Sequence, residues 1–577
     1  MLETIKSPRC SFSPTFVRIA TCGLILIAVF AIYRQCVDDQ FIEFDDGAYV
    51  FRNEVVRSGL SWRNINWALT TTDVGNWHPL TWWAYMLDVE LFDLNAGGHV
   101  LTNIVIHGLA AMVLFVVLER ISGSRGGAAF VALVFAVHPA NVECVAWVSE
   151  KKSVLSALFA FLALGAYWHY GLRPTWWRYV SVVLFYLLSL AAKPMMVSLP
   201  LLVLLLDFWP LRRAQWPVGL NPSASNKPSP HKSDRKTDWK TWLWLIDKLP
   251  LVAMALAVCI VTSIVQFQVG AMGDTVHMPW SMRITNALFS YVRYLGLLLW
   301  PHDHALLYPF PPRYPPILLV SCALGLFSIT WYVLRNARRT PSQFVGWFWF
   351  LITLIPVIGL VQVGSQSMAD RYLYIPMIGP VLWMAIAGHA LGMRWPATRR
   401  IIQLLGASWI AALAISAWTQ ASFWINCETI MRQAIANTRN NFVINGALGT
   451  YFYRAGRLPE AELQFREALK IKPENAGLLA SLATALGSAG RYDEAIELLQ
   501  RSLRLKPKEP GNHNNLGIFY IGIGKIEDAI HEFTEAIRLK PDYAEAKGNL
   551  VAAIAKRPAQ TPTTPPAVDL SIETVTP

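Results

Sequence analysis

Charged side chains are scarce in this sequence. Of its 577 residues only 15% are Asp, Glu, Lys or Arg, whereas 54% are hydrophobic, and the mean hydropathy is +0.35. Soluble globular domains contain about 25% charged residues, so an ordinary soluble protein is excluded. Several apolar runs approach the roughly 20 residues that a helix needs to cross a bilayer. The composition, with its 24 Trp and 35 Pro, therefore predicts an all-α, polytopic membrane protein.

Paired cysteines and a cleavage site are also missing. The seven cysteines contain no CxxC pair, which argues against structural zinc and against a disulfide framework. The first apolar run, 19–33, is followed by no small-residue cleavage site, because "IYRQC" closes it. We therefore expect a retained membrane anchor rather than a removed signal peptide.

Acidic residues are outnumbered, and the formal net charge is +12. Much of the excess lies in short loops between apolar runs, which the positive-inside rule explains better than nucleic-acid binding does. The basic segments 210–248, 335–339 and 394–400 should all be cytoplasmic. All three segments lie on the cytoplasmic side only if residues 283–300 do not cross the membrane and instead form an interfacial or re-entrant helix. The N-terminus is then inside and the C-terminus outside. About eleven transmembrane helices are predicted, at 19–34, 99–118, 126–138, 153–170, 178–192, 195–209, 249–267, 316–334, 344–363, 373–392 and 401–421.

The C-terminal part is polar and repetitive. The segments "LKIKP", "LRLKP" and "IRLKP" end at Pro473, Pro507 and Pro541, and each step is 34 residues. This period, with Ala461, Ala495 and Ala529 in phase, is the tetratricopeptide signature. We expect a polytopic membrane domain over 1–436, an α-solenoid of about three repeats with a capping helix over 437–556, and a disordered tail over 557–577.

Ionisable clusters outside the cytoplasmic loops gather on one predicted membrane face. They lie in "FIEFDDGAYV" (41–50), "GNWHPLTWWAYMLD" (75–88), "HPANVECVAWVSEKKS" (138–153), "HDHALLYP" (302–309) and "SMADRY" (367–372). A carboxylate can take a proton from an acceptor hydroxyl, and Arg or Lys can hold a phosphate leaving group. These clusters therefore suit chemistry on a lipid-linked phosphate.

Six sequence blocks, in order, resemble the TMTC-type, tetratricopeptide-bearing glycosyltransferases of the GT-C fold. Among them are "FDDGAYV", "NWHPLTWW", "HPANVECVAWVSEKKSVLSALF" and "PVIGLVQVGSQSMADRYLYIP", and the likeness covers nearly the whole chain. The resemblance implies transfer of a sugar, usually mannose, from a polyprenyl-phosphate donor to a protein hydroxyl. It also implies an acidic base in the first external loop, which maps to Asp45 or Asp46; we favour Asp46. The residues expected to contact the donor phosphate or substrate are His78, His138, Glu143, Glu150, Lys151, Lys152, Lys193, Asp370 and Arg371.

Structural explanations compete with several of these assignments. An Asp pair before Gly is often a turn or a helix cap, and Lys193 can simply extend from a span end to the interface. For the periodic His99, Asn103 and His107, hydrogen bonding between helices is favoured over metal ligation. "HDH" (302–304) is favoured as a solvated loop. A requirement for a divalent metal stays open, and no cofactor beyond the donor is implied.

Two functions other than an enzyme are considered for the sequence: a transporter and a scaffold. A transporter should show ionisable residues at mid-membrane and repeats among its spans, and neither is clear here. A non-catalytic scaffold needs only a membrane anchor and repeats, and it is the alternative to an enzyme. We expect partners to be the donor lipid, membrane lipids and an acceptor protein held by the repeats, but no nucleic acid. The location expected is a bacterial inner membrane or the endoplasmic reticulum, with the repeats on the periplasmic or lumenal side.

Overall fold

The computed structural model describes residues 13–213, 243–268, 278–361 and 364–557. Within these ranges the regular secondary structure is helical, apart from one β-bridge between Tyr308 and Met368. The prediction of an all-α fold is therefore confirmed. The chain divides into two units, 1–440 and 441–577. This division lies close to the domain boundary predicted at residue 436, and the predicted tail lies outside the described residues except for Arg557.

Each of the eleven predicted spans overlaps a helix of the structure, although the predicted bounds differ, most of all for 344–363, whose helix ends at Leu354. Six helical segments of the described chain are long and apolar enough to cross a membrane, or seven if the bent pair Arg125–Val137 and Pro139–Ala146 is one span. The six contain α1, α5, α8, α12, α15 and α18, and the crossing of the other predicted spans stays a prediction. The helices are α1 (Pro14–Tyr33), α5 (Ala96–Ser122), α6 (Arg125–Val137), α8 (Lys151–Leu172), α9 (Trp176–Ala192), α10 (Leu199–Phe208), α12 (Leu249–Gln268), α15 (Pro316–Asn336), α16 (Pro341–Leu354), α17 (Ile378–Arg394) and α18 (Arg399–Ser422).

The segment predicted to lie at the interface forms α14 (Trp280–Leu299), which packs against α15. It is not among the six apolar segments, and its interfacial placement stays a prediction. The predicted cytoplasmic loop 210–248 lies mostly outside the described residues.

Apolar packing inside the first unit centres on α5. This helix contacts α1, α6 and α8, and α8 in turn packs along α9. Large apolar side chains face outward on the periphery, such as Phe327 and Trp331 of α15, which are 66% and 57% exposed. Such surfaces are unfavourable in water but match a bilayer. Where α16 meets α17, a Cβ on Gly346 would lie 2.6 Å from the Gly379 carbonyl oxygen, so glycine permits the close approach.

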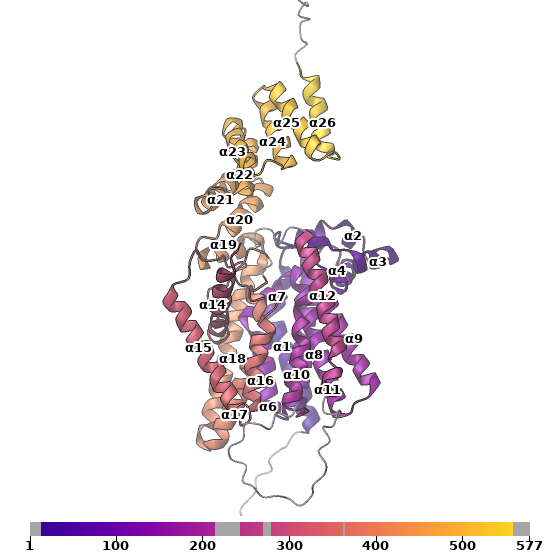
Figure 1. The fold of residues 1–577 in the computed structure, drawn as a ribbon, viewed down its shortest axis with the longest axis vertical. Coiled ribbons are helices and arrows are strands. Elements are labelled where there is room, and N and C mark those ends of the chain that lie inside the picture. Colours follow the sequence, from indigo (N-terminus) through magenta and orange to yellow (C-terminus); the bar gives the residue numbers. More distant parts are fainter. Residues whose placement is uncertain (1–12, 214–242, 269–277, 362–363, 558–577) are drawn as a thin grey trace, which may run out of the picture. The chain divides into compact units, whose positions relative to one another are not determined.

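Short elements collect at one end of this bundle. Figure 1 shows α2 (Glu54–Arg57), α3 (Trp62–Thr70) and α4 (Pro79–Phe92) gathered there. The loop after η1 (Arg34–Asp38) also reaches this end, where Gln40 donates its N–H to the carbonyl of Ile425 in η11 (Phe423–Ile425), which follows α18. Sequence segments far apart in the chain thus meet at this end.

The second unit is a stack of helix pairs. Its helices are α20 (Phe442–Arg454), α21 (Leu458–Ile471), α22 (Ala476–Ser488), α23 (Tyr492–Leu505), α24 (Pro510–Gly522), α25 (Ile526–Leu539) and α26 (Ala544–Ala555). Successive helices pack on one another. Gly456, Gly490 and Gly524 each have a positive φ, between 73° and 80°, in the turn inside a pair. Only glycine adopts this conformation without strain. This explains why a glycine recurs every 34 residues, once in the turn of each pair. The predicted repeats are confirmed, and α26 lies where the capping helix was predicted.

Candidate active site

Asp46 is a buried anchor of the first loop. It precedes the π-helical turn η2 (Gly47–Phe51) and is fully buried. Its Oδ2 accepts the Ile42 N–H at 2.7 Å, and its Oδ1 accepts the Ser149 N–H at 2.9 Å together with the Ser149 hydroxyl. Burial raises the pKa of Asp46 to about 7, against the opposing effect of these hydrogen bonds. Both carboxylate oxygens are therefore already engaged: Oδ2 closes the local turn at Ile42, and Oδ1 joins the loop to η5 (Val148–Glu150).

Asp45 has a different environment. Its side chain is half-buried, and its backbone carbonyl accepts hydrogen bonds from the N–H groups of Ala48 and Tyr49. The carboxylate interacts electrostatically with the Lys152 ammonium and with Tyr49. Of the two aspartates, Asp45 is thus the one that retains exposure and interacts electrostatically with a cation.

Three cations converge on Glu150. Its Oε2 accepts from Lys193 Nζ at 2.9 Å, and its Oε1 lies 3.6 Å from Lys152 Nζ and 3.5 Å from Arg371 Nε. The Glu150 side chain is 3% exposed, whereas those of Lys152, Lys193 and Arg371 retain 11%, 16% and 15%. We call Glu150, Lys152, Lys193 and Arg371 the Glu150 cluster. Its cations are held by a buried carboxylate and keep part of their surface open.

A second carboxylate orients the arginine of this cluster. Arg371 lies in η9 (Asp370–Leu373), and its backbone N–H donates to Glu143 Oε2 at 2.9 Å, while its guanidinium pairs with Glu143 Oε1. The guanidinium also lies over the ring of Trp147, 5.6 Å from the centroid. Three cations thus face two glutamates and the nearby Asp45 carboxylate, and the partly exposed N–H groups of the cations are the donors open to an anion.

Aromatic side chains form one side of the Glu150 cluster. Lys152 Nζ donates to the Tyr49 hydroxyl at 3.2 Å and lies 4.3 Å from the centroid of the same ring. His78 stacks on Tyr49, with centroids 5.6 Å apart, and contacts Trp82 at 4.9 Å. Burial, followed by the charges of Lys152 and Lys193, lowers the pKa of His78 well below its ordinary value, so the imidazole is neutral. Its Nε2 is buried and has no hydrogen-bond partner among the described residues.

Lys151 faces away from its neighbour Lys152. Its Nζ lies 2.7 Å from Asp88 Oδ2 and 2.7 Å from Asn103 Oδ1, and it donates to the His99 carbonyl at 3.0 Å. Successive helix residues point about 100° apart, which explains the separation. Lys151 therefore ties α8 to α4 and α5, and the structure does not bring it into the Glu150 cluster.

The histidines predicted on α5 serve the same helix contacts. Asn103 donates to the carbonyl oxygens of Val145 and Trp147, at 3.3 Å and 3.0 Å. His107 lies 2.7 Å from the Tyr374 hydroxyl and 3.1 Å from the Ala136 carbonyl oxygen. These contacts agree with the expectation of hydrogen bonding between helices.

His138 and Asp370 also have structural partners. His138 Nε2 lies 3.1 Å from the Leu298 carbonyl oxygen, and its Nδ1 accepts the Ala140 N–H. Asp370 holds His304 Nδ1 at 2.5 Å and the Tyr308 hydroxyl at 2.8 Å, so it fixes the loop that contains "HDH". In the part of the chain that the structure describes, no group of three or more His, Cys, Asp or Glu is placed to hold a metal ion.

Sequence reasoning missed Tyr49, Ser149 and Ser153. Tyr49 orients Lys152, Ser149 holds Asp46, and Ser153 accepts from Lys193 Nζ at 2.7 Å. For Tyr49 a signal existed, because it lies four residues after Asp45, a spacing that places side chains on one side of a helical turn. Ser149 and Ser153 carry no comparable signal.

Comparisons with known proteins agree with this architecture. The tetratricopeptide repeat family matches residues 447–510 and 511–543. The chain is 23% identical to mouse "Protein O-mannosyl-transferase TMTC1" over 82% of its length, and 23% identical to the human protein of the same name over 78%. A Drosophila melanogaster protein named Tmtc1 is 26% identical over 36% of the chain. These matches span 60%, 54% and 25% of the respective relatives, so the chain corresponds to about half of the length of the two mammalian proteins.

Solved structures match with low overall similarity. An Arabidopsis OM64 TPR domain is 17% identical, covers 21% of this chain and 100% of that one, and has a TM-score of 0.20. The APC/C hetero-tetramer Cut9–Hcn1 is 14% identical over 82% of this chain and 83% of that one, with a TM-score of 0.23. The resemblance to TMTC-type proteins with tetratricopeptide repeats is confirmed by the named relatives and by the repeat family.

Proposed function

We propose that this chain is an integral-membrane glycosyltransferase of the GT-C type, which moves mannose from a polyprenyl-phosphate donor to a protein hydroxyl. The observation that carries the proposal is the convergence of Lys152, Lys193 and Arg371 on buried Glu150, beside the half-buried Asp45. The names of the curated relatives support the choice of mannose and of a protein acceptor.

The chemistry follows from the charges. The acceptor oxygen forms a bond to the anomeric carbon of the sugar while the bond between that carbon and the phosphate oxygen breaks. Asp45 takes the proton from the acceptor hydroxyl. The departing polyprenyl phosphate gains negative charge, which the three cations of the Glu150 cluster stabilise. Asp46 is a poorer base, because its oxygens already accept hydrogen bonds from Ile42 and Ser149.

The repeats would supply the protein acceptor. Stacked helix pairs form a concave surface suited to an extended polypeptide. In this proposal the site and the repeats both act on the periplasmic or lumenal side. Reporter fusions after residue 436 test that side, and a cytoplasmic signal would contradict the proposed topology.

The central experiment is a transfer assay. Purified full-length protein is incubated with a candidate acceptor protein and, in separate reactions, polyprenyl-phosphate mannose, polyprenyl-phosphate glucose and a free nucleotide sugar. Transfer should require the lipid-linked donor and should be highest with mannose. Transfer from the nucleotide sugar would contradict the assigned donor class. A folded protein that binds the acceptor but uses none of the donors would favour the membrane-anchored scaffold instead.

A further inference from the structure

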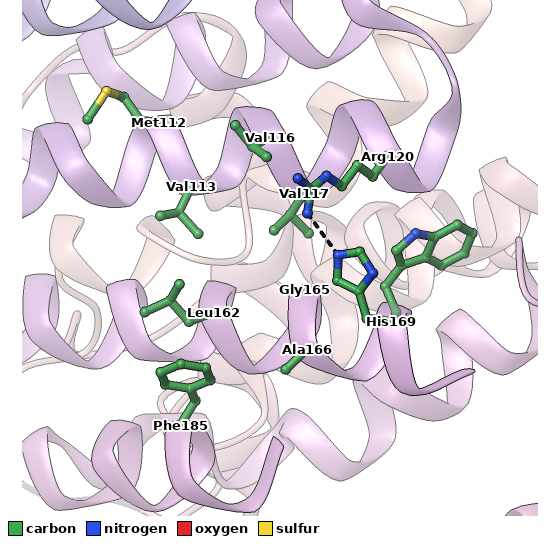
Figure 2. A pocket seen from close by; sticks show the side chains of 11 residues that line it. Met112, Val113, Val116, Val117, Arg120, Leu162, Gly165, Ala166, His169 and Phe185 are labelled. Carbon is green, nitrogen blue, oxygen red and sulfur yellow. Dashed lines mark hydrogen bonds between the residues drawn. The ribbon is translucent and has the colours of Figure 1, made fainter. Parts of the chain in front are cut away.

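An apolar groove runs along the outside of the bundle, far from the Glu150 cluster. It lies between α5, α8 and α9 and has a volume of about 390 Å³. Figure 2 shows Val113 and Val116 on one side of it and Leu162, Ala166 and Phe185 on the other. The volume is within the roughly 300–1,000 Å³ of ligand pockets. An apolar groove on membrane helices is a seat for a hydrocarbon chain.

One end of this groove is basic. Arg120, in the last turn of α5, places its Nη1 2.8 Å from His169 Nε2 (Figure 2). Because a guanidinium only donates, the His169 Nε2 must accept. Nearby, Arg178 donates to the carbonyl oxygens of His169 and Arg173, at 3.0 Å and 3.1 Å. Neither the Arg120 nor the Arg178 guanidinium forms an ion pair with a carboxylate within the described ranges.

The carboxylate next to Arg120 in the sequence is already paired with other arginines. Glu119, adjacent to Arg120, is paired with both Arg18 and Arg125, at 2.8 Å and 2.6 Å. It is therefore not available to neutralise Arg120. The basic end of the groove keeps an uncompensated positive charge at the edge of the apolar surface.

The basic end lies at the level of the lipid head groups. Lys152 of the Glu150 cluster is in the first turn of α8, and His169 is 17 residues later, so the two are roughly 25 Å apart along the helix. This approaches the thickness of the hydrocarbon core. Trp176 and Trp177, exposed and stacked at the start of α9, mark the interface on the same side as His169. The groove therefore opens to the leaflet opposite the Glu150 cluster.

We propose that this groove binds an anionic glycerophospholipid. One acyl chain lies between α5, α8 and α9, and the phosphate binds the Arg120 guanidinium, with Arg178 adding attraction. The occupant is a lipid rather than free phosphate because the site joins a long apolar surface to a single charged end. The proposal is independent of the glycosyltransferase assignment.

The test compares lipids on purified full-length protein in detergent. Phosphatidylglycerol, phosphatidylcholine and inorganic phosphate are titrated separately, and binding is followed by the thermal unfolding midpoint and by native mass spectrometry. Phosphatidylglycerol should remain bound and raise the midpoint, whereas the other two should have little effect. The variant Arg120→Gln should weaken phosphatidylglycerol binding about fivefold, in line with about 1 kcal/mol for each basic residue near an anionic surface.

Two further variants separate the parts of the site. Ala166→Phe places a ring in the groove and should also weaken phosphatidylglycerol binding while leaving Arg120 in place. Arg63→Gln removes an exposed arginine of α3 and should leave binding unchanged. Equal binding of phosphatidylglycerol and phosphatidylcholine, or equal weakening by Arg63→Gln and Arg120→Gln, would overturn the proposal. So would stabilisation by inorganic phosphate that Ala166→Phe does not alter.

Discussion

At the scale of single residues, two neighbouring aspartates have different environments. Both carboxylate oxygens of Asp46 accept hydrogen bonds, from Ile42 and from Ser149, whereas Asp45 is half-buried and interacts electrostatically with the Lys152 ammonium. We expect Asp45→Asn to lower turnover about 10²–10⁴-fold, the usual cost of losing a general base, without loss of fold. Asp46→Asn should instead lower the thermal unfolding midpoint, because an amide cannot accept at both positions.

Activity and folding of the two aspartate variants are measured independently. Turnover is measured with the lipid-linked donor at saturation, and folding is checked by size-exclusion chromatography and by the unfolding midpoint. If the folded Asp45→Asn variant kept full activity and an equally stable Asp46→Asn variant were inactive, the general base would be Asp46 instead of Asp45.

The adjacent lysines provide a matched pair. Lys152→Gln removes a cation that is partly open, so it should raise the KM for the donor while the protein stays folded. Lys151→Gln leaves Asp88 buried without its ammonium partner, which typically costs about 3–5 kcal/mol of stability. Donor titrations and thermal unfolding of both variants check this. A stable Lys151→Gln variant with a selectively raised donor KM would contradict the orientation assigned to these two residues.

At the scale of elements, the sequence predicted what depends on periodicity. Long apolar runs marked the helices, and the 34-residue step of the repeats is repeated in the turns at Gly456, Gly490 and Gly524. The site was predicted less well. Nothing in "FDDG" distinguishes the aspartate that Ser149 holds from the one that stays open, because Ser149 lies 103 residues away. In the same way, only the rotation of α8 decides which of two lysines reaches Glu150.

The repeat helices allow a test of packing at a glycine. A Cβ added to Gly517 of α24 would lie 2.6 Å from the ring of Phe533, a buried residue of α25. Gly511, in the first turn of the same helix, has open space around it. Gly517→Ala should therefore destabilise the repeats by about 1–3 kcal/mol, whereas Gly511→Ala should be neutral or slightly stabilising.

Hydrogen exchange of the full-length protein, followed by mass spectrometry, measures this effect locally. Amides of α24 and α25 should exchange faster in Gly517→Ala and should be unchanged in Gly511→Ala. Identical exchange in both variants would mean that Phe533 moves aside without cost.

At the scale of the whole molecule, the proposed site and the repeats belong to separate units. Asp45 and every member of the Glu150 cluster lie within residues 1–440, and the seven repeat helices lie within 441–577. A site complete within one unit does not need the other for the chemical step. The repeats should then affect only how much acceptor protein is held near the membrane.

Deletion of residues 441–577 tests this division. A tethered binding site raises the effective concentration of its ligand, so its loss should raise the KM for a protein acceptor, by up to about 10²-fold, and leave kcat unchanged. A short acceptor peptide, which does not span the repeats, should be modified at the same rate by the truncated and the full-length protein. Chromatography and the unfolding midpoint establish that the truncated protein is folded. If it is folded and yet loses activity on peptide and protein to the same extent, the repeats contribute to the site itself and the division is wrong.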